Sequence, residues 1–328
     1  MAATAATPDR TVGDFTSRGA IPRVYGEALV ELAREDPRVV CLVADLSPAT
    51  ETDLFRDTLP DRFYNLGIAE ANMMGAAGGM ARSGERPFVH TFSVFATRRC
   101  YDQVAMQIAY PALPVTIVGF LPGLTTLLGV THQAIDDVAL MRALPGMTVI
   151  EPADMDSVRA AVRAAAAHSG PVYLRMRRAE GALAPDFAPR PLSIGRADVR
   201  REGSDAVVFA CGLMVGIALA AAERLATRGR SVAVVDVHTI KPLDAATVQH
   251  WAQCTGHVVT AENHSIVGGL GSAVAETLME AGIPARFRRV GVRDTFAEGG
   301  STSYLFRKYG LDAAAIEVAL AACWGEDR

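Results

Sequence analysis

The chain has 328 residues, of which 50% are hydrophobic and 21% are charged, and its formal net charge is −4. This composition is typical of a globular protein with ample core, and because the chain is about twice as long as an average domain, we expect two domains. The negative charge and the lack of a Lys/Arg run argue against nucleic-acid binding, and no apolar run reaches the roughly 18 residues of a membrane span.

Residues 1–19 contain no apolar segment of the kind found in secretory signals, and we expect them to form a flexible leader. The five cysteines are scattered along the chain without the spacing of a disulfide framework or a zinc site. We therefore expect reduced core thiols in a cytoplasmic protein, and no metal-binding residues in this chain.

Residues 20–180 alternate short apolar runs with helical patterns. The runs are rich in β-branched residues and bounded by Gly, Pro or Asp, which predicts strands at 38–45, 86–92, 114–120, 147–152 and 170–176. Between them the pattern predicts helices at 25–35, from Glu70 onward, at 98–110, 134–144 and 154–168, the last with Asp154 as its N-cap. This alternation indicates a parallel sheet covered by helices on both faces, a three-layer α/β domain.

Residues 181–198 contain several prolines and little periodicity, which predicts a linker. The alternation resumes over residues 199–328, with predicted strands at 205–212, 231–244, 256–264 and 285–292 and helices at 215–228, 244–253, 270–281 and the end of the chain. We expect a second, smaller parallel-sheet domain of the same kind. Ligands of such sheets bind beyond the carboxyl ends of the strands.

Glu70 stands where a predicted strand end gives way to a helix rich in Gly, Ala and Met. The helix dipole and the free amide groups of a first turn stabilise an acid at this position, which is a sufficient structural explanation. However, the glycines indicate that another backbone or subunit approaches closely, and a carboxylate at such a contact is costly unless it meets a donor. An acid that keeps its proton in apolar surroundings is also suited to acid–base chemistry.

Phe92 and Phe95 follow a predicted strand at a spacing that could form an aromatic wall, although such a pair usually belongs to a core. His132 lies in a predicted loop, where a lone histidine usually has no catalytic role. Taken together and in this order, longer segments resemble transketolase: FYNLGIAEANMMGAAGGMARSGERPFVHTFSVF, GVTHQAIDDVALMRALPGMTVIEPAD, GPVYLR, VDVHTIKPLD and TAENHSIVGGLGSAVAE. The likeness covers roughly residues 20–322 and points to the C-terminal subunit of a two-chain transketolase, with a pyrimidine-binding domain followed by a C-terminal domain.

The resemblance implies a thiamine diphosphate cofactor. By resemblance, Glu70 is catalytic because it hydrogen-bonds the pyrimidine ring nitrogen of the cofactor and favours its active tautomer. Phe92 and Phe95 would pack on the pyrimidine ring. His132 matches a histidine that contacts substrate hydroxyls and assists proton transfer, and Arg23 and Arg178 match arginines that hold a sugar phosphate, although either arginine could equally be an ordinary surface residue.

The family holds the cofactor's diphosphate and Mg²⁺ with the motif GDG and a downstream Asn, and GDG does not occur in this sequence. The resemblance therefore implies an N-terminal transketolase subunit as partner, which binds the diphosphate and Mg²⁺, in an α2β2 assembly with the active site at the interface. Glu262 and His264 fall in the C-terminal domain of the family and are assigned to structure.

The substrate loop, GFLPGLTTLLGVTHQ, departs from the family, because Leu127 and Leu128 fall where an acidic pair is usual. A sugar hydroxyl that lost its carboxylate partner would cost about 1–3 kcal/mol. We therefore expect the substrate-binding set Arg23, Leu127, Leu128, His132 and Arg178 to take a non-standard ketose.

The leading hypothesis is a subunit of a transketolase that moves a two-carbon ketol unit from a ketose or ketose phosphate to an aldehyde. One alternative is the β subunit of a 2-oxo acid decarboxylating enzyme that passes an acyl unit to a carrier, because the loop is apolar. Another is a non-catalytic regulatory subunit, motivated by the same altered loop.

Overall fold

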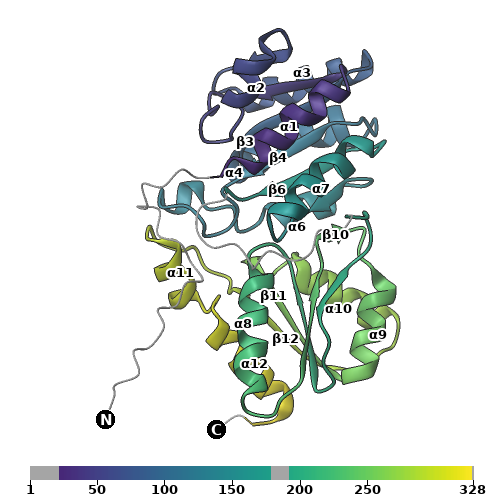
Figure 1. Ribbon diagram of the computed structural model, residues 1–328, viewed down its shortest axis with the longest axis vertical. Helices are drawn as coiled ribbons and strands as arrows, with labels where there is room; N and C mark the ends of the chain where they lie inside the picture. The colour runs from purple at the N-terminus through teal and green to yellow at the C-terminus, as the bar shows by residue number, and fades with distance from the viewer. Residues whose placement is uncertain (1–21, 179–191, 327–328) are drawn as a thin grey trace.

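The computed structural model describes residues 22–178 and 192–326. The expected leader, 1–19, and residues 181–191 of the expected linker lie outside the described residues. Figure 1 shows two α/β units stacked along the long axis, the first in purple to teal and the second in green to yellow. No helix in the described part of the chain is long and apolar enough to cross a membrane.

The first unit is built on a seven-stranded sheet with the order β10-β5-β6-β4-β3-β1-β2. Each of the five strands predicted for this domain is present, and β1 to β6 pair in parallel. The short strand β2 was not predicted. The strands are β1 Val39–Val43, β2 Phe63–Asn65, β3 Arg86–Phe92, β4 Thr116–Phe120, β5 Thr148–Ile150, β6 Val172–Met176 and β10 Thr239–Lys241.

Helices cover both faces of this sheet. On one face α1 (Val24–Glu35) and α7 (Met155–Ala167) lie side by side (Figure 1), and on the other α3 (Glu70–Arg82) and α6 (Asp137–Ala143) contribute buried residues to a second cluster. The predicted N-cap of α7 is confirmed, because Asp154 Oδ1 accepts from Ser157 N at 2.7 Å in a capping box. A short helix, α2 (Asp53–Thr58), follows β1.

The continuous helix predicted at 98–110 is wrong. The chain forms α4 (Ser93–Thr97), a 3-10 turn (Arg98–Cys100), α5 (Tyr101–Gln103) and a π-helix (Val104–Ala109). This π-helix packs on the glycines of α3, since a Cβ at Gly75 would lie 2.6 Å from Gln107 Oε1 and one at Gly78 would lie 2.6 Å from Gln107 O. Gly75 thus admits the side chain of Gln107 and Gly78 admits its backbone, contacts that periodicity in a single segment does not reveal.

The second unit has a five-stranded sheet with the order β12-β11-β8-β9-β7. Helices α8 and α12 pack on one face and α9 and α10 on the other, which gives the predicted three layers. The predicted terminal helix is two helices, α11 and α12. The elements are β7 Asp198–Arg201, β8 Ala206–Ala210, α8 Met214–Ala226, β9 Val232–Asp236, α9 Ala245–Thr255, β11 His257–Ser265, α10 Leu270–Glu280, β12 Arg286–Val292, α11 Thr302–Tyr309 and α12 Ala313–Trp324.

Two edge strands depart from the expected parallel order. Strand β7 starts at the last residue of the expected linker and pairs antiparallel with β9. Strand β10 follows β9 in sequence but joins the sheet of the first unit, antiparallel to β5, with Thr239 opposite Ile150. Each sheet therefore has one antiparallel edge strand. The chain also crosses from the second sheet to the first between β9 and β10.

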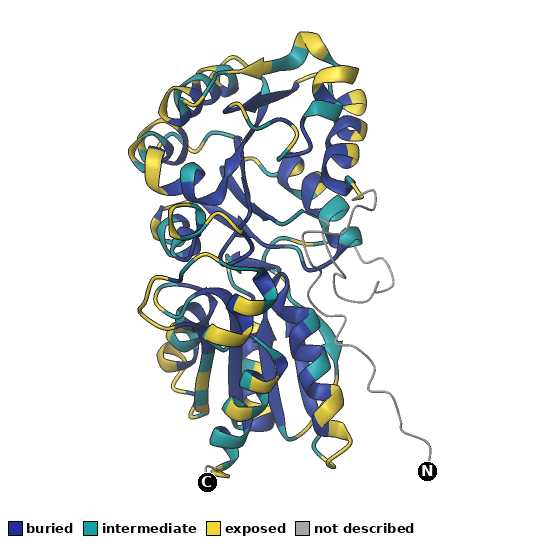
Figure 2. Cartoon of the chain, turned by 90° about the vertical axis from the view of Figure 1, so that its left-hand side faces the viewer, coloured by how far each residue is buried: buried dark blue, intermediate teal, exposed yellow. Residues whose placement is uncertain are grey.

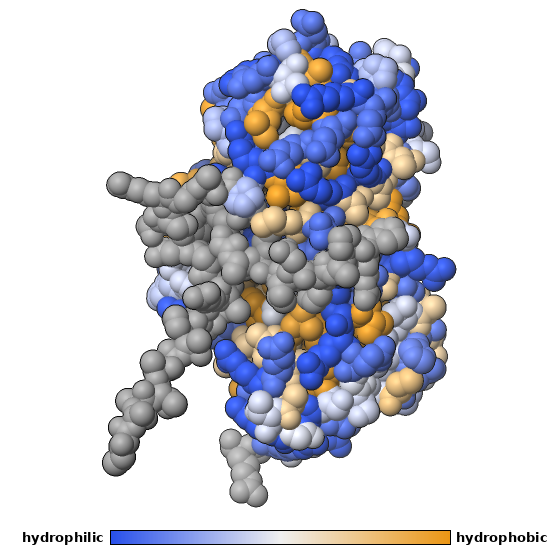
Figure 3. Space-filling view, in the orientation of Figure 1, coloured by the Kyte–Doolittle hydropathy of each residue, from blue (hydrophilic) through white to orange (hydrophobic). Residues whose placement is uncertain are grey.

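The hydrophobic core continues across this junction. One cluster contains Met147 and Val149 of the first unit together with Val237, just before β10, and Ile240 of β10. Figure 2 shows buried residues along both sheets, and Figure 3 shows hydrophobic residues gathered near the junction of the two units on an otherwise largely hydrophilic face. Because apolar burial stabilises in proportion to area, this shared cluster favours a fixed arrangement of the units.

All five cysteines lie in the described residues and remain thiols. Four of them, Cys41, Cys100, Cys211 and Cys323, are buried, as expected for reduced core residues. Burial raises the pKa of the Cys100 thiol to about 12, so the uncharged form prevails near neutral pH and its reactivity is low.

Candidate active site

The candidate residues of the first unit gather at the carboxyl edge of its sheet. Strand β3 ends at Phe92, and the neighbouring β4 ends at Phe120, just before the loop that carries His132. Strand β6, on the other side of β4, ends at Met176 and is followed by Arg178. This is the edge at which parallel α/β sheets bind ligands.

Glu70 is the first residue of α3 and its side chain is 1% exposed. Arg99 Nη1 donates to Glu70 Oε1 at 2.9 Å, so the apolar surroundings expected from the sequence are interrupted by one cation. The other oxygen, Oε2, is buried and has no hydrogen-bond partner among the described residues. Because an unsatisfied buried acceptor costs about 1–3 kcal/mol, an oxygen left in this state indicates a binding position.

An aromatic cluster stands next to this carboxylate. The ring centroids of Phe92 and Phe95 are 6.2 Å apart, and the His132 ring lies 5.2 Å from Phe95 and 6.0 Å from Phe92, edge-on to both. The Arg99 guanidinium lies 3.8 Å from the Phe95 centroid, a cation–π contact. The structure therefore brings Glu70, Phe92, Phe95 and His132 together, with Arg99 between the acid and the rings.

His132 ends a 3-10 turn, Val130–His132, and is half-buried. Burial, and to a lesser degree the positive charge of Arg99, lower the pKa of this imidazole. The Nδ1 atom lies 2.9 Å from Thr131 Oγ1. A largely neutral ring near pH 7 can accept a proton at one nitrogen, as a group that assists proton transfer must.

Arg99 is the functional residue that the sequence analysis missed. The sequence pattern only includes it in the helix predicted at 98–110. The signal was present, because Phe95 and Arg99 are separated by the i, i+4 interval at which side chains of a helical turn meet. In the structure Arg99 contacts Glu70 and the Phe95 ring, and its positive charge lowers the pKa of His132.

Arg23 and Arg178 form a second group around a buried acid, Glu51. Arg23, at the N-cap of α1, pairs with Asp53, and both arginines lie close enough to Glu51 to lower its pKa. Burial acts in the opposite direction and is the larger effect, so the pKa of Glu51 is raised overall. Glu51 has a φ of 60°, a left-handed conformation that a glutamate rarely adopts, and its Oε2 accepts from Gly26 N at 3.0 Å.

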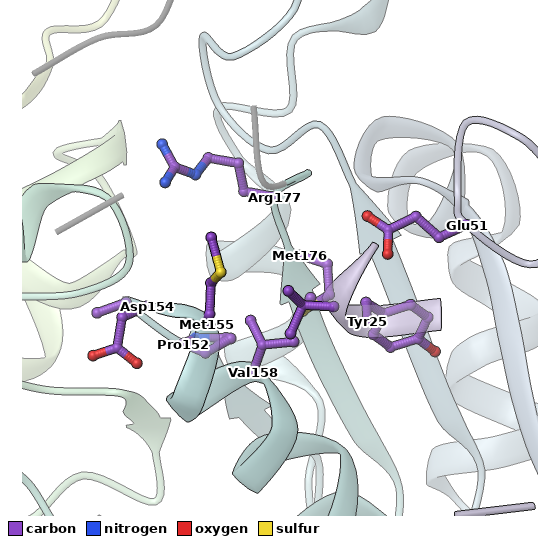
Figure 4. A pocket seen from close by; sticks show the side chains of 10 residues that line it. Tyr25, Glu51, Pro152, Asp154, Met155, Val158, Met176 and Arg177 are labelled. Carbon is purple, nitrogen blue, oxygen red and sulfur yellow. The ribbon is translucent and has the colours of Figure 1, made fainter. Parts of the chain in front are cut away.

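A small pocket, with about 20 Å³ of accessible space, opens beside this second group. Figure 4 shows Glu51 and Tyr25 on one side of Met176, with Pro152 and Asp154 on the other. The lining residues are Val24, Tyr25, Glu51, Pro152, Ala153, Asp154, Met155, Val158, Met176 and Arg177. The pocket therefore has a mixed lining, apolar in its middle and charged at both ends.

The loop between β4 and His132 presents two of its four leucines, Leu127 and Leu128, to solvent. Leu127 is 49% exposed and Leu128 is 56% exposed, so neither is a core residue. Leu121, at the start of the loop, has a φ of 55°, which is strained for a residue other than glycine. The loop thus offers an apolar surface on the same segment as His132.

The acid and histidine assigned to structure are both hydrogen-bonded, and His264 also contacts the first unit through Ala139 N at 3.4 Å. Glu262 Oε2 accepts from Leu270 N at 2.7 Å and Oε1 accepts from Gly271 N at 2.8 Å, at the start of α10. His264 Nδ1 lies 2.7 Å from Ser265 O. These contacts support a structural role for both residues.

Comparison with known proteins gives the same two units. Residues 20–182 match the family model of the transketolase pyrimidine-binding domain, and residues 195–316 match that of the transketolase C-terminal domain. The chain is 48% identical over 293 residues to the 6-deoxy-6-sulfo-D-fructose transketolase subunit SqwH of a Clostridium species, covering 89% of this chain and 90% of that protein.

Two further comparisons agree. An uncharacterized transketolase family protein, y4mN, of Sinorhizobium fredii is 45% identical over 299 residues, covering 90% of this chain and 86% of that protein. A solved structure described as a split gene transketolase, inactive beta4 tetramer, superposes with a TM-score of 0.85 at 44% identity and covers 93% of this chain and 98% of its own. The chain therefore belongs to the transketolase family.

Proposed function

We propose that this chain is the pyrimidine-binding and C-terminal subunit of a two-chain, thiamine diphosphate-dependent transketolase. With its partner it moves a two-carbon ketol unit from a ketose to an aldehyde. The observation that carries this proposal is the buried Oε2 of Glu70, which lacks a partner in the described residues while Oε1 is held by Arg99.

The residues around Glu70 fit the pyrimidine half of the cofactor. Oε2 offers the hydrogen-bonding oxygen that a protonated ring nitrogen needs, and Phe92 and Phe95 offer aromatic faces for a flat ring. Arg99 fixes the orientation of the carboxylate through Oε1. When bound, thiamine diphosphate supplies the carbon nucleophile that attacks the ketose carbonyl.

His132 serves the substrate in this proposal. Its imidazole lies edge-on to both phenylalanines and its pKa is lowered, so a ring nitrogen is available to take a proton from a substrate hydroxyl and return it. Arg99 supports this state because its positive charge disfavours the imidazolium form.

The diphosphate half of the cofactor requires a partner subunit. The sequence lacks the GDG motif, and within residues 22–178 and 192–326 no group of three or more His, Cys, Asp or Glu side chains is placed to hold a metal ion. We propose that the partner binds the diphosphate and Mg²⁺, in an α2β2 assembly in the cytoplasm, where the cysteine thiols remain reduced. A solved relative described as an inactive assembly of β chains agrees with a site that needs two kinds of chain.

We propose a modified ketose with an anionic terminal group as the donor. Arg23 and Arg178 supply positive charge around Glu51, while Leu127 and Leu128 present apolar surface where the family has acids. The Clostridium relative is described as acting on 6-deoxy-6-sulfo-D-fructose, a ketose that has lost one hydroxyl and carries a terminal anion. Such a donor keeps the free hydroxyls of the corresponding ketose phosphate and differs from it in the terminal anion, which the two arginines would bind.

The test is reconstitution with the N-terminal subunit that carries the GDG motif. When both chains, thiamine diphosphate and Mg²⁺ are present, we expect the donor ketose to be consumed and a new ketose to form from the aldehyde acceptor. We expect no reaction with either chain alone. Turnover by the isolated chain at the rate of the mixture would contradict the two-chain assignment.

A 2-oxo acid donor is the second candidate, because the exposed leucines of the loop suit a less hydroxylated compound. Assays with a panel of ketose and 2-oxo acid donors distinguish the two candidate functions. Release of CO₂ from a keto acid would favour the decarboxylating enzyme, whereas loss of a ketose without CO₂ favours ketol transfer. A mixture whose rate does not depend on the side chain of Glu70 would instead indicate a regulatory subunit.

A further inference from the structure

The loop of residues 121–132 leaves the sheet of the first unit but packs on the second unit. Leu124 is 0% exposed and Ile135, just after the loop, is 8% exposed, and both belong to the hydrophobic cluster formed by α8, α12 and the second sheet. The loop is therefore anchored by the C-terminal unit, although it carries residues of the candidate site.

One side chain of the second unit holds the start of this loop. Asn263, on β11, donates through Nδ2 to Pro122 O at 3.1 Å and accepts through Oδ1 from Leu124 N at 2.9 Å. Gly123, between these two points, has a φ of 57° and lies so close to Asn263 that a Cβ would overlap it. An amide is the side chain that can serve a carbonyl and an N–H at the same time.

A buried arginine fixes both Asn263 and the end of the loop. Gly123 N donates to Ala134 O at 2.9 Å and so closes the loop on itself. Arg175 Nη2 donates to Ala134 O at 3.2 Å and to Asn263 O at 2.9 Å. Arg175 is itself held by Asp137 at 2.7 Å and Glu151 at 2.8 Å, and all three side chains are buried.

A second contact from the C-terminal unit holds the other end of the loop. Gln133 Nε2 donates to Glu298 O at 2.9 Å, and the Glu298 carboxylate accepts from Tyr304 at 2.8 Å and also from Lys308 and Tyr309. The loop is thus held from the second unit at both ends, while its exposed leucines lie between these anchors.

We infer that the C-terminal unit positions the loop of residues 121–132, and that Asn263 is the residue that holds its backbone in the position needed to bind the donor. The inference rests on the proposed function, since it assigns the loop to the donor. Exposed leucine side chains cannot order a loop by hydrogen bonding, so its backbone must be fixed by other groups. The two backbone groups that Asn263 fixes, Pro122 O and Leu124 N, lie five and three residues before Leu127.

The first experiment measures the loop directly, without catalysis. Hydrogen–deuterium exchange of peptides covering 121–132 is followed in the full chain and in Asn263→Ala. We expect roughly tenfold faster exchange in the variant, because the two hydrogen bonds from the Asn263 side chain to the loop backbone are lost. Asn263→Asp keeps the acceptor for Leu124 N but loses the donor to Pro122 O, and we expect an intermediate rate.

Arg142→Ala is the matched control. Arg142 also joins the two units, through Gly269 O at 3.1 Å and Glu276 at 2.8 Å, but it does not contact the loop. We expect it to leave exchange of 121–132 unchanged. Equal exchange in wild type and both Asn263 variants, or equal acceleration in Arg142→Ala, would overturn the inference.

The second experiment uses the reconstituted enzyme. In Asn263→Asp we expect KM for the donor to rise about tenfold, while the affinity for thiamine diphosphate stays unchanged, because Glu70, Phe92 and Phe95 are untouched. A lowered melting temperature with an unchanged KM would assign Asn263 to stability alone and overturn the inference. If the mixture shows no ketol transfer but the exchange result holds, the proposed function fails and the positioning of the loop stands.

Discussion

Each unit has a buried glutamate at the start of a helix, and the two differ in how completely they are hydrogen-bonded. Glu70 is the first residue of α3, whereas Glu262 lies on β11 and faces the first turn of α10, and both are at most 2% exposed. Both oxygens of Glu262 accept backbone N–H groups. One oxygen of Glu70 meets Arg99, and within the described residues the other has no partner.

The difference teaches how to separate a structural acid from one that awaits a ligand. Gly269, which lacks a side chain, lets Glu262 approach the amides of α10, because a Cβ there would overlap the carboxylate. The partner of Glu70 is a half-exposed arginine that also lies over the Phe95 ring, and it engages only Oε1 of the carboxylate. Burial alone would have ranked the two acids as equals.

Of the substitutions that test this comparison, we expect a change at Glu70 to have the largest effect on activity. We expect Glu70→Gln to lower kcat of the reconstituted enzyme by roughly 100- to 10,000-fold, because an amide cannot share a proton with the cofactor ring. The melting temperature should change little, since Oε2 makes no hydrogen bond within the described residues. Steady-state kinetics and thermal unfolding on the same preparation check both points, and a variant with the wild-type rate would remove Glu70 from the chemistry.

Substitution of Glu262 should do the reverse. Glu262→Gln places an NH₂ group against a backbone N–H donor of α10, and we expect the free energy of unfolding to fall by about 1–3 kcal/mol. The kcat of the folded fraction should stay within about twofold, as for a change remote from the reacting atoms. Urea denaturation measures the loss, and a large fall in kcat without loss of stability would reverse our assignment of the two acids.

The pH dependence of the free energy of unfolding gives a further test of the role of Glu262. Burial raises the pKa of Glu262 to about 7, above its ordinary value, so the native state holds this proton where the unfolded chain has released it. The free energy of unfolding should therefore fall as pH rises from about 4.5 to 7. Glu262→Gln should flatten this slope only in part, because burial also raises the pKa of Asp236 to about 7. An equal slope in variant and wild type would contradict the prediction.

The smallest expected effect concerns His132. Because Arg99 is one of the two causes of its lowered pKa, we expect Arg99→Gln to move the pKa of His132 upward, toward the ordinary histidine value, without restoring it fully. Burial, the larger cause, remains in the variant. An NMR titration of the imidazole protons measures this change, and a pKa that does not move would place Arg99 outside the electrostatic range of the ring.

Much of the fold could be predicted from the sequence because its signals are local. The period of apolar residues identified the central strands, and Asp154 identified the start of α7 through a cap that involves only its next turn. The group of Glu70, Phe92, Phe95 and His132 could be anticipated through the resemblance and the rule that parallel strands end at one edge. The roles of these residues remain the subject of the proposed experiments.

Other features depend on contacts between distant segments, and only the tertiary structure decided them. The helix pattern at 98–110 gave way to a π-helix because Gly75 and Gly78 admit Gln107, and β10 joined the first sheet because β5 offered it an open edge. Arg99 reaches an acid 29 residues away and Asn263 reaches a loop more than 130 residues away. Local patterns determined where the chain forms strands and helices. The pairing of buried polar groups requires partners in space, and it decided which acid is satisfied and which part of the molecule holds the loop of residues 121–132.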